Sequence, residues 1–124
     1  MVQITVPDWI VHRADAESKR STIYTLSVHP DGTRLATGGL DTKVRVWATA
    51  PILDASDNDT PHLLSTLARH TGAVLAVRWS HSGRYLASGS DDTVALIWEL
   101  DETSGGGGFS FGSNEASAVS YTHL

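Results

Sequence analysis

The chain has 124 residues, a formal net charge of −5 at pH 7 and no cysteine. This length corresponds to about one small domain, and the acidic balance argues against a general nucleic-acid surface, which requires a basic patch. The lack of cysteine excludes disulfides and thiolate metal sites. Because neither a secretory signal nor a run of roughly 18 apolar residues for a membrane span occurs, we expect a soluble intracellular protein.

The N-terminal part, residues 1–22, is predicted to contain one strand and one loop. Ile4 to Val11 is apolar, contains Trp9 and is interrupted by Pro7, whereas residues 13–21 are polar. The apolar run favours a strand, and the polar run favours a loop that leads into the next part of the chain.

The following part of the chain contains one unit twice. Residues 74–99, the second copy, align without a gap to residues 23–48, the first copy, so that Trp98 corresponds to Trp47. Identical residues stand at seven aligned positions: Gly32, Leu35, Ala36, Gly38, Asp41, Thr42 and Trp47 match Gly83, Leu86, Ala87, Gly89, Asp92, Thr93 and Trp98. A repeated supersecondary unit cannot bury its apolar faces alone and stacks on its neighbours.

Each copy is predicted to form three short strands. In the second copy these are Val74 to Trp79, Tyr85 to Ser88 and Val94 to Trp98, with Gly83 in the first turn. The first copy uses Pro30-Asp31-Gly32 as its turn, where Asp can bond its own backbone and Gly can adopt a positive φ. After a predicted loop over residues 49–61, Leu63 to Leu67 supplies a fourth strand to the first copy.

Both copies end in the pattern apolar-Ala-[Ser/Thr]-Gly-x-x-Asp-x-x-apolar-x-apolar-Trp. This pattern resembles the WD40 repeat, which folds as a four-stranded blade of a β-propeller, although the usual final Asp is absent from Trp47-Ala48 and Trp98-Glu99. Since propellers close with about 4–8 blades, the resemblance implies an all-β fragment of a WD40 β-propeller with about two blades. Its parts are 1–22, the ring-closing strand and loop of a longer protein; 23–68, the first blade; 69–100, a partial second blade; and 101–124, a tail.

The tail is predicted to be flexible because Gly105 to Gly108 form a linker-like run. No fourth strand of the second copy is recognisable, and Ala116 to Leu124 carries no repeat signal. The last five residues, SYTHL, resemble translated sequencing-adapter sequence and are interpreted as non-native, so the tail is left out of the functional interpretation.

The resemblance also implies a structural tetrad of His, Ser or Thr, Asp and Trp in each blade. The matching residues are His70, Ser88, Asp92 and Trp98 in the second blade, and His12, Thr37, Asp41 and Trp47 in the first. His12 stands further upstream than His70 because residues 13–21 contain an insertion. The alternative is a catalytic Ser-His-Asp triad, which is disfavoured because the G-x-S-x-G elbow is missing and the set recurs in both copies.

The clearest candidate for partner binding is the acidic loop that carries Asp54, Asp57 and Asp59, although a charged loop is usually only solvated. We expect it to share one surface with the turn at residues 30–33, while the turns at 39–43 and 90–94 lie on the other. No cofactor or metal site is expected, because the glycine runs lack the Lys-Ser/Thr of a P-loop and the histidines lack paired metal-ligand spacing.

Beyond the blade motif, the sequence resembles the N-terminal start of the HIRA/Hir histone-regulator family, and most of all its fungal members. The segments that carry this resemblance are Trp9, His12, residues 23–25, 31–41, 69–72, 86–92, 97–98 and 111–115. The resemblance implies a non-catalytic nuclear scaffold of a histone-chaperone complex, with histones and other subunits as partners, in replication-independent chromatin assembly and repression of histone genes. Two alternatives stay open: the middle subunit of chromatin assembly factor 1, and a generic WD40 adaptor.

Overall fold

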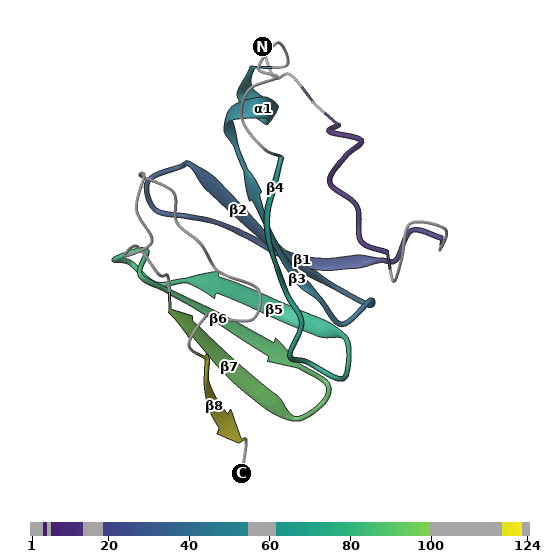
Figure 1. Cartoon of the computed structure of the whole chain (residues 1–124), viewed down its shortest axis with the longest axis vertical. Helices are drawn as coiled ribbons and strands as arrows, with labels where there is room; N and C mark the ends of the chain where they lie inside the picture. Colours follow the sequence, from purple (N-terminus) through teal and green to yellow (C-terminus); the bar gives the residue numbers. More distant parts are fainter. Residues whose placement is uncertain (1–3, 5, 14–18, 55–61, 100–117, 123–124) are drawn as a thin grey trace.

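The structure, a computed structural model, describes residues 4, 6–13, 19–54, 62–99 and 118–122. Its strands are β1 (Ile23–Val28), β2 (Arg34–Gly39), β3 (Val44–Ala48), β4 (Leu63–Leu67), β5 (Val74–Trp79), β6 (Tyr85–Ser90), β7 (Val94–Glu99) and β8 (Ala118–Thr122). One short helix, α1 (Ala50–Leu53), lies between β3 and β4. The strands form two four-stranded antiparallel sheets, β1-β2-β3-β4 and β5-β6-β7-β8 (Figure 1). The predicted all-β fold of a partial propeller is confirmed.

Two kinds of tight turn connect the strands of each sheet. The β1–β2 and β5–β6 turns place Gly32 and Gly83 at φ values of 77° and 75°, as the sequence predicted. In the first of these turns, the Thr33 N–H donates to Asp31 Oδ1 at 2.9 Å. The β2–β3 and β6–β7 turns instead place threonines, Thr42 and Thr93, at positive φ, which is costly for a β-branched residue.

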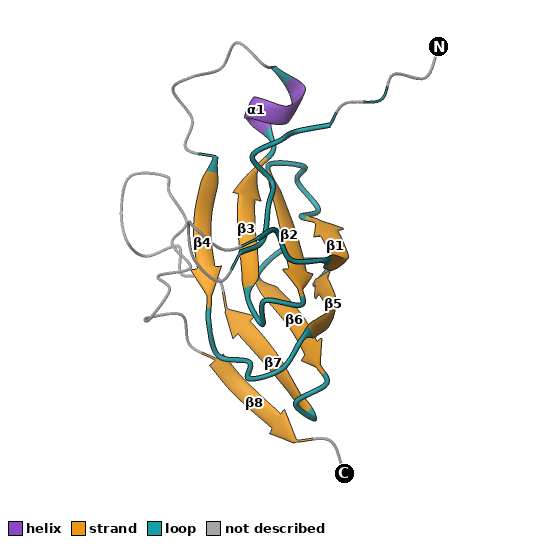
Figure 2. Ribbon diagram, turned by 90° about the vertical axis from the view of Figure 1, so that its right-hand side faces the viewer, coloured by secondary structure: helices purple, strands orange, loops and turns teal. Residues whose placement is uncertain are grey.

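The two sheets share one apolar core. Its buried members come from both sheets: Ala36, Val44, Val46, Leu67, Val74, Val77, Leu86, Leu96 and Trp98. Where the sheets meet, β1 lies beside β5 (Figure 2). The Val77 N–H of β5 donates to Thr25 Oγ1 at 3.2 Å, and the Trp79 N–H donates to Ser27 Oγ at 3.3 Å. Side-chain hydroxyls of one sheet thus satisfy backbone donors of the next.

The opposite face of β1 is apolar and open. Side chains alternate along a strand, so Tyr24, Leu26 and Val28 point away from the hydroxyls that contact β5, and they are 49–58% exposed. Such an uncovered side face is what a partial propeller presents where a further blade would pack.

The structure corrects the sequence analysis between β3 and β4 and after β7. Residues 50–53 form a helical turn within the predicted loop, with Pro51 in its first turn and buried, a position that proline favours because it needs no N–H there. At the end of the chain, β8 pairs with β7 from Ala118 opposite Trp98 to Thr122 opposite Val94. The second sheet therefore has the fourth strand that the sequence analysis did not find. The edge of β7 offers unpaired backbone groups, which an extended segment can satisfy without any repeat motif.

The N-terminal part differs from the strand expected over Ile4 to Val11. The described residues of this stretch, 4 and 6–11, form no strand, and the nearest pairing is an isolated antiparallel bridge between His12 and Ser21. A ring-closing role for this stretch stays a prediction about the longer protein. The predicted glycine linker lies outside the described residues.

Candidate functional site

The four residues picked out in the second sheet form one continuous hydrogen-bonded chain. The Trp98 indole N–H donates to Ser88 Oγ at 2.9 Å, and Ser88 Oγ lies 2.8 Å from His70 Nε2. His70 Nδ1 lies 3.0 Å from Asp92 Oδ2. Because a carboxylate only accepts, Nδ1 carries the proton in the neutral ring, and Nε2 accepts from the serine hydroxyl. Ser88 and Trp98 are 2% and 1% exposed.

Asp92 receives two further hydrogen bonds from the backbone. The Thr71 N–H donates to Oδ2 at 2.9 Å and the Val94 N–H donates to Oδ1 at 2.9 Å. Burial works to raise the pKa of Asp92, but these two N–H groups and His70 together lower that pKa to about 2. Asp92 is therefore ionised at neutral pH, which is the form that can accept from all three donors.

The first sheet brings together the corresponding four residues. The Trp47 indole N–H donates to Thr37 Oγ1 at 2.8 Å, and Thr37 Oγ1 lies 2.6 Å from His12 Nε2. His12 Nδ1 lies 2.8 Å from Asp41 Oδ1, and both side chains are fully buried. Burial lowers the pKa of His12, against the opposing effect of the Asp41 carboxylate, so the ring is neutral at pH 7.

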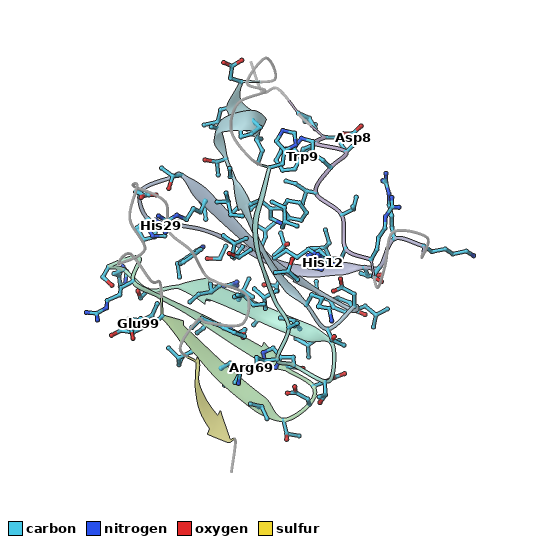
Figure 3. The ribbon with its side chains drawn as sticks, viewed as in Figure 1. Asp8, Trp9, His12, His29, Arg69 and Glu99 are labelled. Carbon is cyan, nitrogen blue, oxygen red and sulfur yellow. The ribbon has the colours of Figure 1, made fainter. Side chains whose placement is uncertain are left out.

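A backbone bridge explains how His12 reaches this position despite the insertion. The Ser21 N–H donates to the His12 carbonyl at 2.7 Å, so the two ends of the insertion lie side by side. His12 comes from the segment that precedes β1 and contacts Asp41 in the β2–β3 turn; Figure 3 shows its side chain among the strands.

Arg45 is a fifth member of the first network, and the sequence analysis missed it. Its Nη2 donates to Asp41 Oδ2 at 3.2 Å and to the Arg13 carbonyl at 2.9 Å, while its Nη1 donates to Thr66 Oγ1 at 3.2 Å. One feature of the sequence could have indicated this role: Arg45 aligns with Leu96, which is apolar and buried, so the two copies differ at this position. A charge at one of two otherwise equivalent strand positions suggests a partner that only one copy has.

The two sets of four residues satisfy one another's polar side-chain atoms, whereas the Nε of the added Arg45 is buried without a hydrogen-bond partner among the described residues. Each hydroxyl oxygen accepts from an indole N–H and bonds a histidine, and each carboxylate accepts from several N–H groups. In a catalytic triad the hydroxyl oxygen must be free to attack a substrate, whereas Thr37 and Ser88 are 1% and 2% exposed. This geometry favours stabilisation of the sheets over chemistry.

Of the three acidic-loop residues, only Asp54 lies in the described part of the chain, and it is exposed at the end of α1. Asp57 and Asp59 lie outside it. The Thr49 N–H donates to the Thr33 carbonyl at 3.1 Å, so the start of this loop lies beside the turn at residues 30–33. Within the described residues, no group of three or more His, Asp or Glu is placed to hold a metal ion, and no helix has the length and apolarity to cross a bilayer.

Comparison with known families assigns the repeated unit. The WD domain, G-beta repeat family matches residues 12–48 and 61–99, more than half of the chain. The chain belongs to the WD40 repeat family. The first match covers β1, β2 and β3, and the second covers β4 of the first sheet together with β5, β6 and β7 of the second, so the matched repeat is offset from the sheets by one strand. The two four-stranded sheets are therefore WD40 blades. His12 is the first residue of the first match, so the matched region includes the histidine that precedes the insertion.

Related fungal proteins resemble the chain over nearly all of its length. It is 60% identical over 124 residues to Protein HIR1 of Mycosarcoma maydis, covering 97% of this chain and 12% of that protein. Protein HIR1 of Cryptococcus neoformans var. neoformans serotype D is 49% identical, with 99% of this chain and 14% of that protein covered. Protein hir1 of Schizosaccharomyces pombe is 45% identical, covering 86% and 12%. These relatives confirm the predicted resemblance to fungal Hir proteins, of which the chain spans only a small part.

Among solved structures, the crystal structure of Saccharomyces cerevisiae Sqt1 superposes with a TM-score of 0.61 at 15% sequence identity. The match covers 84% of this chain and 24% of that chain. At this identity the similarity supports the fold alone.

Proposed function

We propose that this chain is part of a non-catalytic WD40 scaffold in a nuclear histone-chaperone complex, acting in replication-independent chromatin assembly and in repression of histone gene transcription. The observation that carries the proposal is the 60% identity to a HIR1 protein over 97% of this chain. Since the chain spans 12–14% of the first three such relatives, the activity belongs to the longer protein, in which this part would contribute two blades.

Within this proposal, the two four-residue networks are structural tetrads. Their members are His12, Thr37, Asp41 and Trp47 in the first blade, and His70, Ser88, Asp92 and Trp98 in the second. The support is that each network joins the turn after its second strand to the segment before its first strand, and that the hydroxyl in each is inaccessible. A buried polar network of this kind stabilises a blade only while every member has its partner.

Partner binding is assigned to the surface that carries the acidic loop and the turn at residues 30–33. Asp54 is exposed there, Asp57 and Asp59 follow it in the sequence, and Asp31 is exposed in the neighbouring turn. Carboxylates in one place attract basic partners and raise their association rate, and histones are basic proteins. The charge of −5 is compatible with such partners.

The experiment is affinity purification of the tagged full-length protein from nuclei of its own cells. Recovery of histones and other chaperone subunits, independent of DNA synthesis, is expected. Recovery with the replication clamp machinery would favour the chromatin-assembly-factor alternative, and recovery with a cullin or signalling complex would contradict both.

The loop assignment has its own test in the same purification. Replacing Asp54, Asp57 and Asp59 by Asn should reduce histone recovery, most strongly at low salt where surface charges are least screened. Asp91→Asn is the matched control, because Asp91 is an exposed acid in the β6–β7 turn, on the other surface. Equal loss in both variants would contradict the assignment to the loop.

A further inference from the structure

His29 joins the two blades at the end of β1. Its ring is 7% exposed, and Nε2 donates to the Gly83 carbonyl in the β5–β6 turn of the second blade at 2.9 Å. The ring also meets Trp79 edge-on, with 4.8 Å between the ring centroids and an interplanar angle of 72°. Figure 3 shows His29 where the first turns of the two blades approach each other.

The other ring nitrogen of His29 is held by its own turn. The Asp31 N–H lies 3.1 Å from Nδ1, and the Asp31 carboxylate Oδ1 lies 2.8 Å from the same nitrogen. Because the Gly83 carbonyl only accepts, the Nε2 that faces it carries a proton. Asp31 is itself fixed, because Oδ1 accepts from the Thr33 N–H at 2.9 Å and from the Thr33 hydroxyl at 2.6 Å. The contacts with Asp31 thus fix the orientation of the His29 ring, whose Nε2–H donates to the second blade.

Trp79 makes the reciprocal contact from the second blade. Its indole N–H donates to the Ser27 carbonyl of β1 at 3.1 Å, and its backbone N–H donates to Ser27 Oγ at 3.3 Å. One side chain from each blade therefore bonds the backbone of the other, and the two rings pack against each other between these bonds.

Two equivalent glycines show how tightly this joint is packed. Gly32 and Gly83 occupy the same position of the two copies and have nearly the same φ, 77° and 75°. A Cβ at Gly32 would have no atom within 4 Å, whereas a Cβ at Gly83 would lie 2.2 Å from His29 Nε2. Gly83 is therefore required both by its backbone angle and by the histidine of the neighbouring blade.

We propose that His29 and Trp79 form a clasp that specifies the pairing of the first blade with the second. In the aligned copies, Ser80 stands at the position of His29 and Val28 at the position of Trp79. Two copies of the first blade would lack the tryptophan, and two copies of the second would lack the histidine. The clasp forms only when β1 meets β5, so it favours the native order over the alternatives that repeats of the same fold permit.

A double-mutant cycle, measured by chemical denaturation of the longer protein with all its blades, tests the clasp. Gly32→Ala should lower the folded-to-unfolded ratio by about tenfold through its backbone angle alone. Gly83→Ala should lower it by about a hundredfold or more, because the new methyl group also collides with His29. In a His29→Ala background, Gly83→Ala should cost only the tenfold effect of the control. Equal effects of the two glycine substitutions, unchanged by removal of His29, would overturn the proposal.

Hydrogen exchange of two indole N–H groups covers the case in which Gly83→Ala does not fold. In the His29→Ala variant, the Trp79 Nε1–H at the joint should exchange faster, while the Trp98 Nε1–H in the second blade's network should change much less. Acceleration of both by the same factor would mean a general loss of stability and would contradict a local clasp.

Discussion

Both blades carry a histidine, a hydroxyl residue, an aspartate and a tryptophan in the same hydrogen-bonded order, yet the aspartate accepts from different donors in the two blades. Asp92 is 8% exposed and takes a backbone donor from Thr71, directly after His70. Asp41 is fully buried and takes the guanidinium of Arg45 instead. The reason is local: in the first blade the insertion follows His12, and Arg45 also donates to the carbonyl of Arg13, the residue directly after His12. Both carboxylates need hydrogen-bond donors, but the residue that supplies them depends on the segment of the chain that lies beside each one.

The largest effect should come from Asp41→Ala. This change leaves the His12 imidazole, the Lys43 N–H and the Arg45 guanidinium without their common acceptor in a fully buried place. Breaking a buried ion pair by removing one partner typically costs about 3–5 kcal/mol, and we expect the free energy of unfolding to fall by about this amount. A loss no larger than that of Asp92→Ala would show that Arg45 adds nothing to the first blade.

Arg45→Leu converts the first network toward the second, because Leu96 stands at the aligned position. Asp41 Oδ2 and the Arg13 carbonyl lose their donor, and we expect a loss of about 1–3 kcal/mol in denaturant unfolding. Arg84→Leu is the control: the Arg84–Glu99 pair is short, at 2.7 Å, but its side chains are 63% and 39% exposed, so its loss should cost less than about 1 kcal/mol. Equal effects would contradict a role for Arg45 in the network.

The two networks should also respond to different ranges of acid. The pKa of His12 is lowered from 6.5 by burial, so the unfolded chain binds more protons and stability falls as the pH drops below about 6.5. The pKa of Asp92 is lowered from 3.8 to about 2, so its contribution is present above about pH 4 and is lost toward pH 2. The free energy of unfolding, measured across this range, should decline as the pH falls through each of the two intervals. His12→Gln should flatten only the upper one, and a profile already flat between pH 6.5 and 5 in the unmodified chain would contradict a buried neutral His12.

The smallest expected effect on stability concerns the threonines at positive φ, which occur in both blades. Thr42 and Thr93 have φ values of 73° and 72°, an angle that costs a β-branched residue about 1–2 kcal/mol. Asparagine tolerates this region better, so Thr42→Asn and Thr93→Asn should each raise the free energy of unfolding by about 0.5–1 kcal/mol. Thr22→Asn, at an exposed residue without positive φ, should leave it unchanged. An increase in the free energy of unfolding by Thr22→Asn equal to those in the turns would contradict the explanation by positive φ.

Most of the fold could be predicted because the repeat and its turn residues act locally. The apolar runs of β4 and β5 and the glycines of the β1–β2 and β5–β6 turns were found from the sequence, with the bounds of both strands correct. The strand β8 was not found, because pairing with the β7 edge depends on backbone groups that every sequence has. The helix α1 was missed because one turn of helix is too short to show a period.

The eight residues of the candidate site could be predicted from the sequence, but the additional donor that completes the first network was not predicted. The eight residues of the two networks follow from the family pattern, and the structure brings each set of four together. The mismatch with Leu96 marks Arg45 as unusual but does not identify its partners, because a charged residue in a strand ordinarily faces solvent. One of its partners, the Arg13 carbonyl, lies directly after His12, which is paired with Ser21 in the bridge that spans the insertion. Similarly, the contact of His29 with Gly83 depends on how two blades stack, which no single copy encodes.

The central claim is that these networks stabilise the blades and take no direct part in binding or chemistry. Asp92→Ala tests it most directly in the full-length protein, with the free energy of unfolding and recovery of partners measured on the same preparation. Removal of the carboxylate leaves His70 and the N–H groups of Thr71 and Val94 unsatisfied, and we expect a loss of about 1–3 kcal/mol, with partners retained wherever the variant is folded. Unchanged stability together with lost partner binding would contradict the claim and would make Asp92 part of a recognition surface.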